Sequence, residues 1–372
     1  MKKIIVLILI IFINNSYANA IEEVILEKNS LDLNYLSNIY YGKVEDKNEI
    51  SPILRLFSKD GLEFENSKIN KIKATFLYSG HLSYGNTNHN GQFLSHDFHT
   101  VEPMVSIYFN ENKSKFMFDI NLTRSLEGYS NWFTQRISQI YFSHQINPNQ
   151  KIVIGQYGRI PNSFDGSRST WNQEMVLKSQ LGRTLGDSRS VGLKNIGHYK
   201  YFDYDIGIYD STRYMKDFGK GADFTGYFMI KPLANISEKT GELKIGSGYN
   251  IGENNISYNI YSFMLGYDYK KFHTHIEYAN ANGYNAIQES NNDADGFYTL
   301  VSYDITPKLT ILGRYDIFDY NKHISNDNVS EYTIGISYNI FTNMKLMLNY
   351  VRRDYENMPD SNLILFATRF FI

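Results

Sequence analysis

The chain contains no cysteine, which suits an oxidising compartment in which no disulfide is needed. Beyond its N-terminus it has no stretch that approaches the roughly 18 apolar residues of a membrane-spanning helix. Basic and acidic side chains nearly balance, at 37 and 39, and no charge excess points to a nucleic-acid partner. Aromatic residues are instead abundant, with 31 Tyr and 24 Phe among 372 residues.

The C-terminal third of the sequence reads as one amphipathic segment after another. Residues 261–269 place Tyr, Phe and Leu on alternate positions, and residues 272–278 repeat the pattern with His273, His275 and Glu277 on the opposite face. A side-chain period of two is typical of a β-strand. No helical layer is visible that would bury the apolar face, so the pattern predicts a closed barrel, apolar outside and polar inside. Because only alternate residues of a barrel face lipid, the mean hydropathy of -0.39 is compatible with a membrane protein.

The predicted fold class is therefore all-β: a transmembrane antiparallel β-barrel of about 16 strands with an inward-folded third extracellular loop. The expected strands are residues 70–80, 101–110, 115–124, 132–146, 150–160, 188–197, 201–212, 222–232, 242–251, 257–269, 272–281, 296–305, 309–320, 331–340, 345–356 and 362–372. Short connections, expected as periplasmic turns, include 147–150, 270–271, 306–308 and 342–343. Long connections, expected on the extracellular side, lie near 81–100, 161–187, 282–295 and 321–330.

Residues 1–20 have the three parts of a secretory signal peptide. Lys2 and Lys3 form the charged part, residues 4–13 the apolar part, and Ala18-Asn19-Ala20 the cleavage signal. A membrane anchor is the alternative, but the apolar part is too short to span a bilayer. We expect export, cleavage near Ala20 and location in the outer membrane of a Gram-negative cell.

The remaining chain is expected to divide into two parts. Residues 21–66 differ from the rest and predict an N-terminal periplasmic extension, with a small hairpin over 53–64 around Asp60-Gly61. Residues 67–372 form the predicted transmembrane barrel. Its last strand is expected to pair with its first strand, because pairing removes the free sheet edge.

From Gly155 onward, short motifs occur in an order and spacing that resemble the phosphate-selective porin O and P family of outer-membrane porins. The motifs are Gly155-Gln-Tyr-Gly-Arg-Ile-Pro161, Arg189-Ser-Val-Gly-Leu193, Tyr204-Asp-Ile-Gly-Ile-Tyr209, Glu277-Tyr-Ala-Asn280, Gly296-Phe-Tyr298, Arg314-Tyr-Asp-Ile-Phe-Asp319, Ile334-Gly-Ile-Ser-Tyr338 and Leu348-Asn-Tyr350. The resemblance covers roughly the C-terminal 60% of the chain. It implies a porin of about 16 strands that assembles as a homotrimer and is constricted by its third loop. It does not by itself imply phosphate as the solute.

The longest connection, residues 161–187, is too long for a mere connector and is the candidate to fold inward. Within it, residues 171–181 predict a short helix that starts at Ser169 or Thr170. Charged side chains beside a narrow passage filter solutes by the sign of their charge. The predicted constriction and selectivity residues are Arg159, Asp165, Arg168, Glu174, Lys178, Arg183, Asp187 and Arg189, and the predicted lumen-facing residues are His273, His275, Glu277, Arg314 and Arg353. A solvated surface loop is the alternative.

These residues predict a porin through which small hydrophilic solutes or ions diffuse passively. Selection of phosphate would need a run of Arg and Lys along the pore, because guanidinium groups bind oxyanions bidentately. The basic candidates, which also include Lys194, are interrupted by acids such as Asp316. We therefore favour a general or weakly selective channel over a phosphate- or anion-selective porin. Its expected partners are outer-membrane lipid and small solutes or ions, and no cofactor is implied.

Three other kinds of function compete with the channel. A metal site would use His273, His275 and Glu277, or the histidines at 81, 89, 96 and 99. Same-face strand residues lie about 7 Å apart, too far for the converging ligands of zinc, so no metal is expected. A barrel hydrolase would need a nucleophile motif such as G-x-S-x-G, which is missing from the sequence, so we expect no enzyme. A surface adhesin is the third alternative. Trp132 and Trp171 are the rings to consider for a sugar track inside the lumen.

Overall fold

The computed structural model describes residues 56–57, 61–64, 68–86, 92–124, 136–157, 164–186, 189–213, 219–285 and 289–372. The predicted signal peptide and nearly all of the predicted N-terminal extension lie outside the described residues. The described part of that extension includes β1 (Leu62–Glu63), which pairs with Lys71 and Ile72 of the barrel. The strand at the end of the predicted hairpin thus pairs with the barrel.

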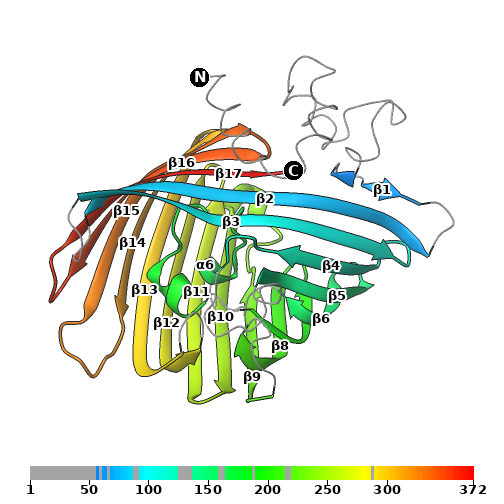
Figure 1. Ribbon diagram of the computed structural model, residues 1–372, viewed down its shortest axis with the longest axis horizontal. Coiled ribbons are helices and arrows are strands. Elements are labelled where there is room, and N and C mark those ends of the chain that lie inside the picture. Colours follow the sequence, from blue (N-terminus) through cyan, green and yellow to red (C-terminus); the bar gives the residue numbers. More distant parts are fainter. Residues whose placement is uncertain are drawn as a thin grey trace.

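Sixteen antiparallel strands, β2 to β17, form a closed barrel in which each strand pairs with the next and β17 pairs with β2 (Figure 1). The strands are β2 (Ile69–Asn86), β3 (Gln92–Phe109), β4 (Ser114–Ile120), β5 (Ile137–Asn147), β6 (Gln150–Tyr157), β7 (Ser190–His198), β8 (Phe202–Arg213), β9 (Ala222–Ile230), β10 (Glu242–Glu253), β11 (Ser257–Tyr269), β12 (Phe272–Asn285), β13 (Glu289–Thr306), β14 (Leu309–Asp319), β15 (Asn328–Phe341), β16 (Met344–Tyr355) and β17 (Ser361–Phe371). Every predicted strand overlaps one of these, so the predicted fold class is confirmed.

Two of the expected long loops are mostly strand. β2 and β3 extend through the segment expected as the loop 81–100 and pair there, with His81 opposite Asp97. They are the long blue and cyan strands of Figure 1. β12 and β13 likewise extend through most of 282–295. The expectation was wrong because polar residues in these segments were taken as loop, whereas they pair with a partner strand.

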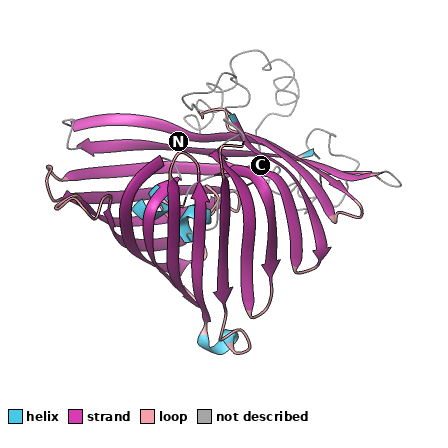
Figure 2. Ribbon diagram, turned by 90° about the horizontal axis from the view of Figure 1, so that it is seen from below, coloured by secondary structure: helices cyan, strands magenta, loops and turns pink. Residues whose placement is uncertain are grey.

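One connection at the short-turn end is longer than expected. Between β9 and β10 the chain forms the short helix α8 (Ser237–Thr240), which lies at the edge of the barrel in Figure 2. A hydrogen bond from the backbone N–H of Gly241 to the carbonyl of Ser237 (2.8 Å) closes its last turn. The alternation of short and long connections therefore has an exception at this position.

The barrel closes along β17 and β2, as predicted. Their register runs from Asn362 opposite Asn86 to Phe371 opposite Leu77. Beyond it, the backbone N–H of Ile372 donates to the carbonyl of Phe76 (3.0 Å). The last strand is thus paired along its length, and neither β17 nor β2 leaves a free edge at the seam.

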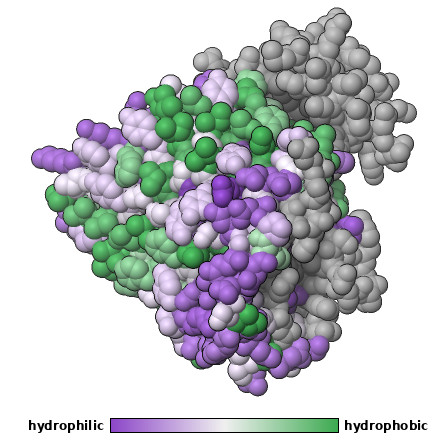
Figure 3. Space-filling model, turned by 90° about the vertical axis from the view of Figure 1, so that its left-hand side faces the viewer, coloured by the Kyte–Doolittle hydropathy of each residue, from purple (hydrophilic) through white to green (hydrophobic). Residues whose placement is uncertain are grey.

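The two faces of the sheet differ as the alternating pattern predicts. Large apolar side chains project outward, with Phe263 54% and Ile334 64% exposed. Figure 3 shows such residues spread over one side of the barrel, while hydrophilic residues gather toward its lower end. A surface of this kind would be unfavourable in water over so wide an area.

No helix among the described residues is long and apolar enough to cross a membrane.

The inner face is less polar than a water-filled barrel predicts. From β11 to β17 it carries apolar or small residues, including Ala279, Ala281 and Ala294, that are fully buried. Residues of the β6–β7 segment pack on them, so that the hydrophobic core lies inside the barrel between this segment and one wall. Figure 2 shows the two short helices of the segment enclosed by the strands. Small wall residues leave the space that the segment occupies.

Gly85 permits the close approach of β2 and β17 at the seam. Its φ is +156°, and an added Cβ would lie 1.9 Å from the backbone oxygen of Asn362. We predict that Gly85→Ala lowers the free energy of unfolding by about 1–3 kcal/mol, the cost of a strained backbone position. Urea titration of the refolded barrel in detergent measures this change. Gly313→Ala is the matched control, because an added Cβ there has nothing within 4 Å, and equal stability of both variants would contradict the prediction.

Candidate functional site

The segment that connects β6 and β7 enters the lumen and forms two short helices, α6 (Phe164–Ser167) and α7 (Gln180–Thr184). The helix predicted over 171–181 is wrong. α7 begins later because the Ser179 side chain caps it, accepting a hydrogen bond from the N–H of Gly182 (3.0 Å). The residues before Ser179 form turns and bends, and several of their carbonyls accept bonds from the barrel wall. We call residues 164–186 the lumen segment.

Arg369 of β17 is the main donor to the lumen segment. Its side chain is 1% exposed, and its Nη atoms donate to the carbonyls of Gln173 (3.0 Å), Met175 (3.1 Å) and Val176 (3.1 Å). The Gln173 side chain accepts a further bond, at 3.0 Å. Because a guanidinium offers five donors in a fixed plane, one arginine can satisfy several carbonyls that have no strand partner.

Lys345 of β16 assists Arg369. Its Nζ donates to the carbonyls of Trp171 and Gln173 and lies 4.8 Å from the centre of the Trp171 ring. The same ring packs edge-on against Phe371, at 4.5 Å between centroids. Trp171 is therefore part of the attachment of the segment. We call Arg369 and Lys345 the segment anchor.

A second contact is a buried cluster of three arginines and two acids. Arg314 pairs with Asp316 (Nε to Oδ2, 2.8 Å) and with Glu331 (Nη2 to Oε1, 2.6 Å). Glu331 also binds Arg353 (2.7 Å) and Arg183 of the lumen segment (3.0 Å). Arg314 in addition donates to the carbonyl of Leu177, at 2.8 Å. Glu331 is thus shared by three guanidinium groups.

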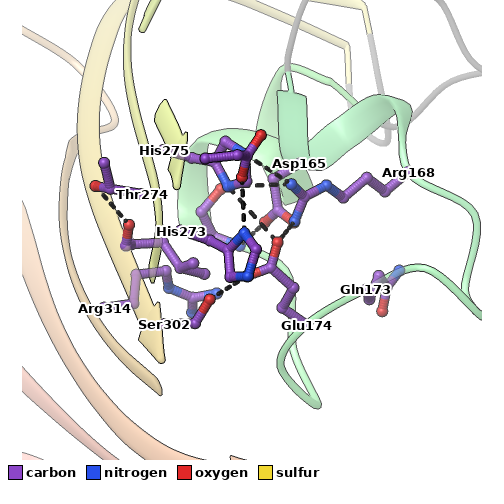
Figure 4. A network of polar contacts seen from close by, with 12 residues as sticks. Asp165, Arg168, Gln173, Glu174, His273, Thr274, His275, Ser302 and Arg314 are labelled. Carbon is purple, nitrogen blue, oxygen red and sulfur yellow. Dashed lines mark hydrogen bonds and ion pairs between the residues drawn. The ribbon is translucent and has the colours of Figure 1, made fainter. Parts of the chain in front are cut away.

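The third contact is the network of Figure 4, in which Arg168 points toward the wall. Arg168 pairs with Glu174 and lies 3.1 Å from Nδ1 of His275. Glu277 accepts the backbone N–H of Phe164, at 2.9 Å. Burial alone would lower the pKa of Arg168, but Glu174 together with Tyr298 and Asp165 outweighs burial and raises it. The guanidinium therefore stays charged.

Asp165 holds the two ends of the lumen segment together. Its carboxylate accepts the backbone N–H of Ser179, and Lys178 donates to the carbonyl of Gly166, at 3.0 Å. Burial would raise the pKa of Asp165, but the nearby charges of Arg314 and Arg168 outweigh it and lower the pKa. Asp165 is thus an ionised carboxylate with a structural role inside the segment.

The structure brings most of the predicted site residues together. Arg168 and Glu174 of the segment contact His275 of the wall, and Arg183 shares Glu331 with Arg314 and Arg353. Glu277 binds the segment backbone, whereas Asp165 and Lys178 bond within the segment. His273 is apart from them and bonds Asp268 (2.9 Å) and Asp304 (3.3 Å). Arg189 lies 3.9 Å from Glu102 on the other side of the barrel. Arg159 and Asp187 lie outside the described residues.

Sequence reasoning missed the segment anchor and Glu331. The signal for Arg369 was the strand period. It puts Arg369 on the face of its strand that is opposite to the face of Phe366, and so inside the barrel. Among the histidines considered as metal ligands, His81 and His96 lie on strands, and His89 is outside the described residues. Within the part of the chain that the structure describes, no group of three or more His, Cys, Asp or Glu side chains could hold a metal.

The wall without the lumen segment carries lysines in register. Reading across β2 to β7, Lys71 stands opposite Tyr108, which stands opposite Lys115. The same register continues through Ser143 and Val153 to Lys194. Lys73 lies two residues from Lys71 on β2, and Lys151 lies two residues from Val153 on β6, so both are on the same face as this register. We call these five lysines, Lys71, Lys73, Lys115, Lys151 and Lys194, the lysine row.

Tyrosines accompany the lysine row. Nζ of Lys115 lies 5.2 Å from the ring centre of Tyr141, and Nζ of Lys194 lies 4.1 Å from that of Tyr157. Lys194 also pairs with Asp205, at 2.6 Å. The charged groups that act on Lys115 are two other lysines of the row, Lys151 and Lys73. This wall therefore presents positive charge and aromatic faces together.

Solved outer-membrane proteins have the same fold. The anion-selective porin from Comamonas acidovorans matches with a TM-score of 0.60 and 10% identity, covering 81% of this chain and 99% of that chain. The outer membrane channel DcaP of Acinetobacter baumannii matches with a TM-score of 0.55 and 12% identity, covering 84% and 99%. OmpT, an outer membrane protein of Vibrio cholerae, matches in a trimer form with a TM-score of 0.56 and 11% identity, covering 81% and 99%. No family model and no curated protein matches the chain. At these identities the likeness establishes the fold.

The segment anchor gives a direct test of how the lumen segment is held. We predict that Arg369→Met leaves the carbonyls of Met175 and Val176 without their Arg369 donor, each at a cost of about 1–3 kcal/mol. Amides of residues 171–178 should then exchange with deuterium at least tenfold faster (about 1.4 kcal/mol per decade), while β17 stays protected. Mass spectrometry of the folded barrel in detergent measures this exchange. Arg352→Met is the control, because Arg352 projects outward; unchanged exchange in Arg369→Met would refute the anchoring role.

Proposed function

We propose that this protein is an outer-membrane porin, a passive diffusion channel for small hydrophilic solutes or ions. The observation that carries the proposal is a lumen segment folded into a closed barrel of sixteen strands. A barrel of this strand number is wide enough for an aqueous passage, and the segment narrows it. The apolar outer face supplies the surface that a bilayer requires.

The neighbouring structures support this location and activity. They include an anion-selective porin and an outer membrane channel, and one of them is a trimer form. We therefore propose a homotrimer, reached by export with cleavage near Ala20. An enzyme or an adhesin would leave the inward folding of residues 164–186 without a purpose, so we propose no enzymatic activity.

Selectivity is proposed to arise from the asymmetry of the lumen. Charges on the lumen segment are largely paired with the wall or with each other, as in the pairs Arg168–Glu174 and Arg183–Glu331. On the facing wall, the charged groups that act on Lys115 are Lys151 and Lys73 of the lysine row. A passing anion would therefore meet a favourable potential there. This observation favours an anion-preferring channel, the alternative to the weakly selective one, without requiring phosphate specificity.

Reconstitution into a planar bilayer tests the channel itself. We expect stepwise conductance from the folded protein, and a higher single-channel conductance after residues 163–186 are replaced by a short Gly-Ser linker. Removing the segment widens the passage and should raise conductance about twofold. Circular dichroism establishes that the shortened barrel is folded. A folded barrel without conductance would overturn the proposal, and an unchanged conductance would exclude the segment as the constriction.

The reversal potential in a KCl gradient tests the sign of the selectivity. We expect chloride to permeate better than potassium, and the combined substitutions Lys115→Gln and Lys151→Gln to lower this preference about twofold. Lys308→Gln is the control, because Lys308 lies exposed in a turn outside the lumen. A cation preference in the unaltered protein would contradict the role of the lysine row.

A further inference from the structure

A cavity of about 700 Å³ opens at the barrel end opposite Ile372. It lies between the β14–β15 connection, the end of β16 with its connection to β17, and α7 of the lumen segment. Its volume falls within the range of small-molecule sites. Gln180 closes its floor through a hydrogen bond from Nε2 to the carbonyl of Val329, at 2.8 Å.

Arginines form the inner end of this pocket. Arg183 and Arg353 both line it and share one carboxylate, Glu331. Arg314 binds the same carboxylate, so that three guanidinium groups share Glu331. Nη1 of Arg183 is buried and has no hydrogen-bond partner among the described residues. A carboxylate on a solute would accept from such donors and balance the charge.

Acids form the outer end of the pocket. Asp327 lines it, and Oδ1 of Asp327 is buried without a partner among the described residues. Asp319 lies close enough to Asp327 for the two carboxyl side chains to interact. Glu356 lies three residues beyond Arg353 along the chain, about 10 Å in extended backbone. Carboxylates gathered in this way favour an ammonium group.

The sides between these ends are aromatic and apolar. Tyr320 and Tyr355 line the pocket together with Leu177 and Met358. The pocket thus has positive charge at its inner end, negative charge at its outer end and apolar sides between them. This arrangement matches a molecule that carries both charges and a small side chain. We propose that this pocket binds zwitterionic solutes of amino-acid or dipeptide size at the mouth of the barrel. The proposal rests on the channel function proposed above and names a solute class for it.

Saturation-transfer difference NMR on the full chain in detergent tests the pocket without requiring conductance. The probes are alanyl-alanine, which carries both charges, N-acetylalanine, which carries the negative charge alone, and alaninamide, which carries the positive charge alone. Alanyl-alanine should bind about tenfold more tightly than either of the other two, because charge-assisted bonds form at both ends.

Substitutions at each end separate the two charges. Arg353→Met should weaken alanyl-alanine binding about tenfold, whereas Arg352→Met, on the neighbouring outward residue, should leave it unchanged. Asp327 lies in the β14–β15 connection, and Asp327→Asn should reduce the affinity for alanyl-alanine to that for N-acetylalanine. Equal binding of alanyl-alanine and N-acetylalanine, or an unchanged affinity in Asp327→Asn, would overturn the zwitterion site. Conductance of the same preparation, recorded without solute, reports separately on the channel.

Discussion

A chain segment that leaves a sheet and crosses a lumen must find donors for its backbone carbonyls elsewhere. In this protein the donors are side chains of the wall, chiefly Arg369 with Lys345 and Arg314. Without them the non-helical part of the lumen segment would have to bond water or fold into a helix. The bonds from Arg369 hold the backbone of Met175 and Val176 against the wall.

Anchoring on one side divides the interior into two unlike halves. The half from β11 to β17 is filled by a hydrophobic core whose small residues, such as Ala279, admit the lumen segment. The half from β2 to β7 carries lysines and tyrosines in a single register. Because the charges of the lumen segment are largely paired, the β2–β7 wall determines the electrostatic potential in the open part of the lumen.

Much of the fold could be predicted from the sequence because the strand period is local information. The sixteen strands, the closing pair and the lumen-facing side of His275 follow from alternation alone. The extents of β2 and β3 could not be predicted, because polar residues near a strand end look like loop until their partner strand is known. The predicted helix over 171–181 was wrong because the conformation of this segment also depends on a partner that is distant in the sequence. Its carbonyls bond to Arg369, a residue almost two hundred positions away, and no local pattern contains that contact.

The position of Arg369 on β17, the strand that closes the barrel, has a consequence for the order of assembly. The lumen segment is made long before Arg369, so the bonds from Arg369 cannot form before the final strand arrives. The strand that pairs with β2 at the seam also carries Arg369 to the carbonyls of Gln173 and Met175. The anchoring of the lumen segment is therefore complete only when β17 is in place.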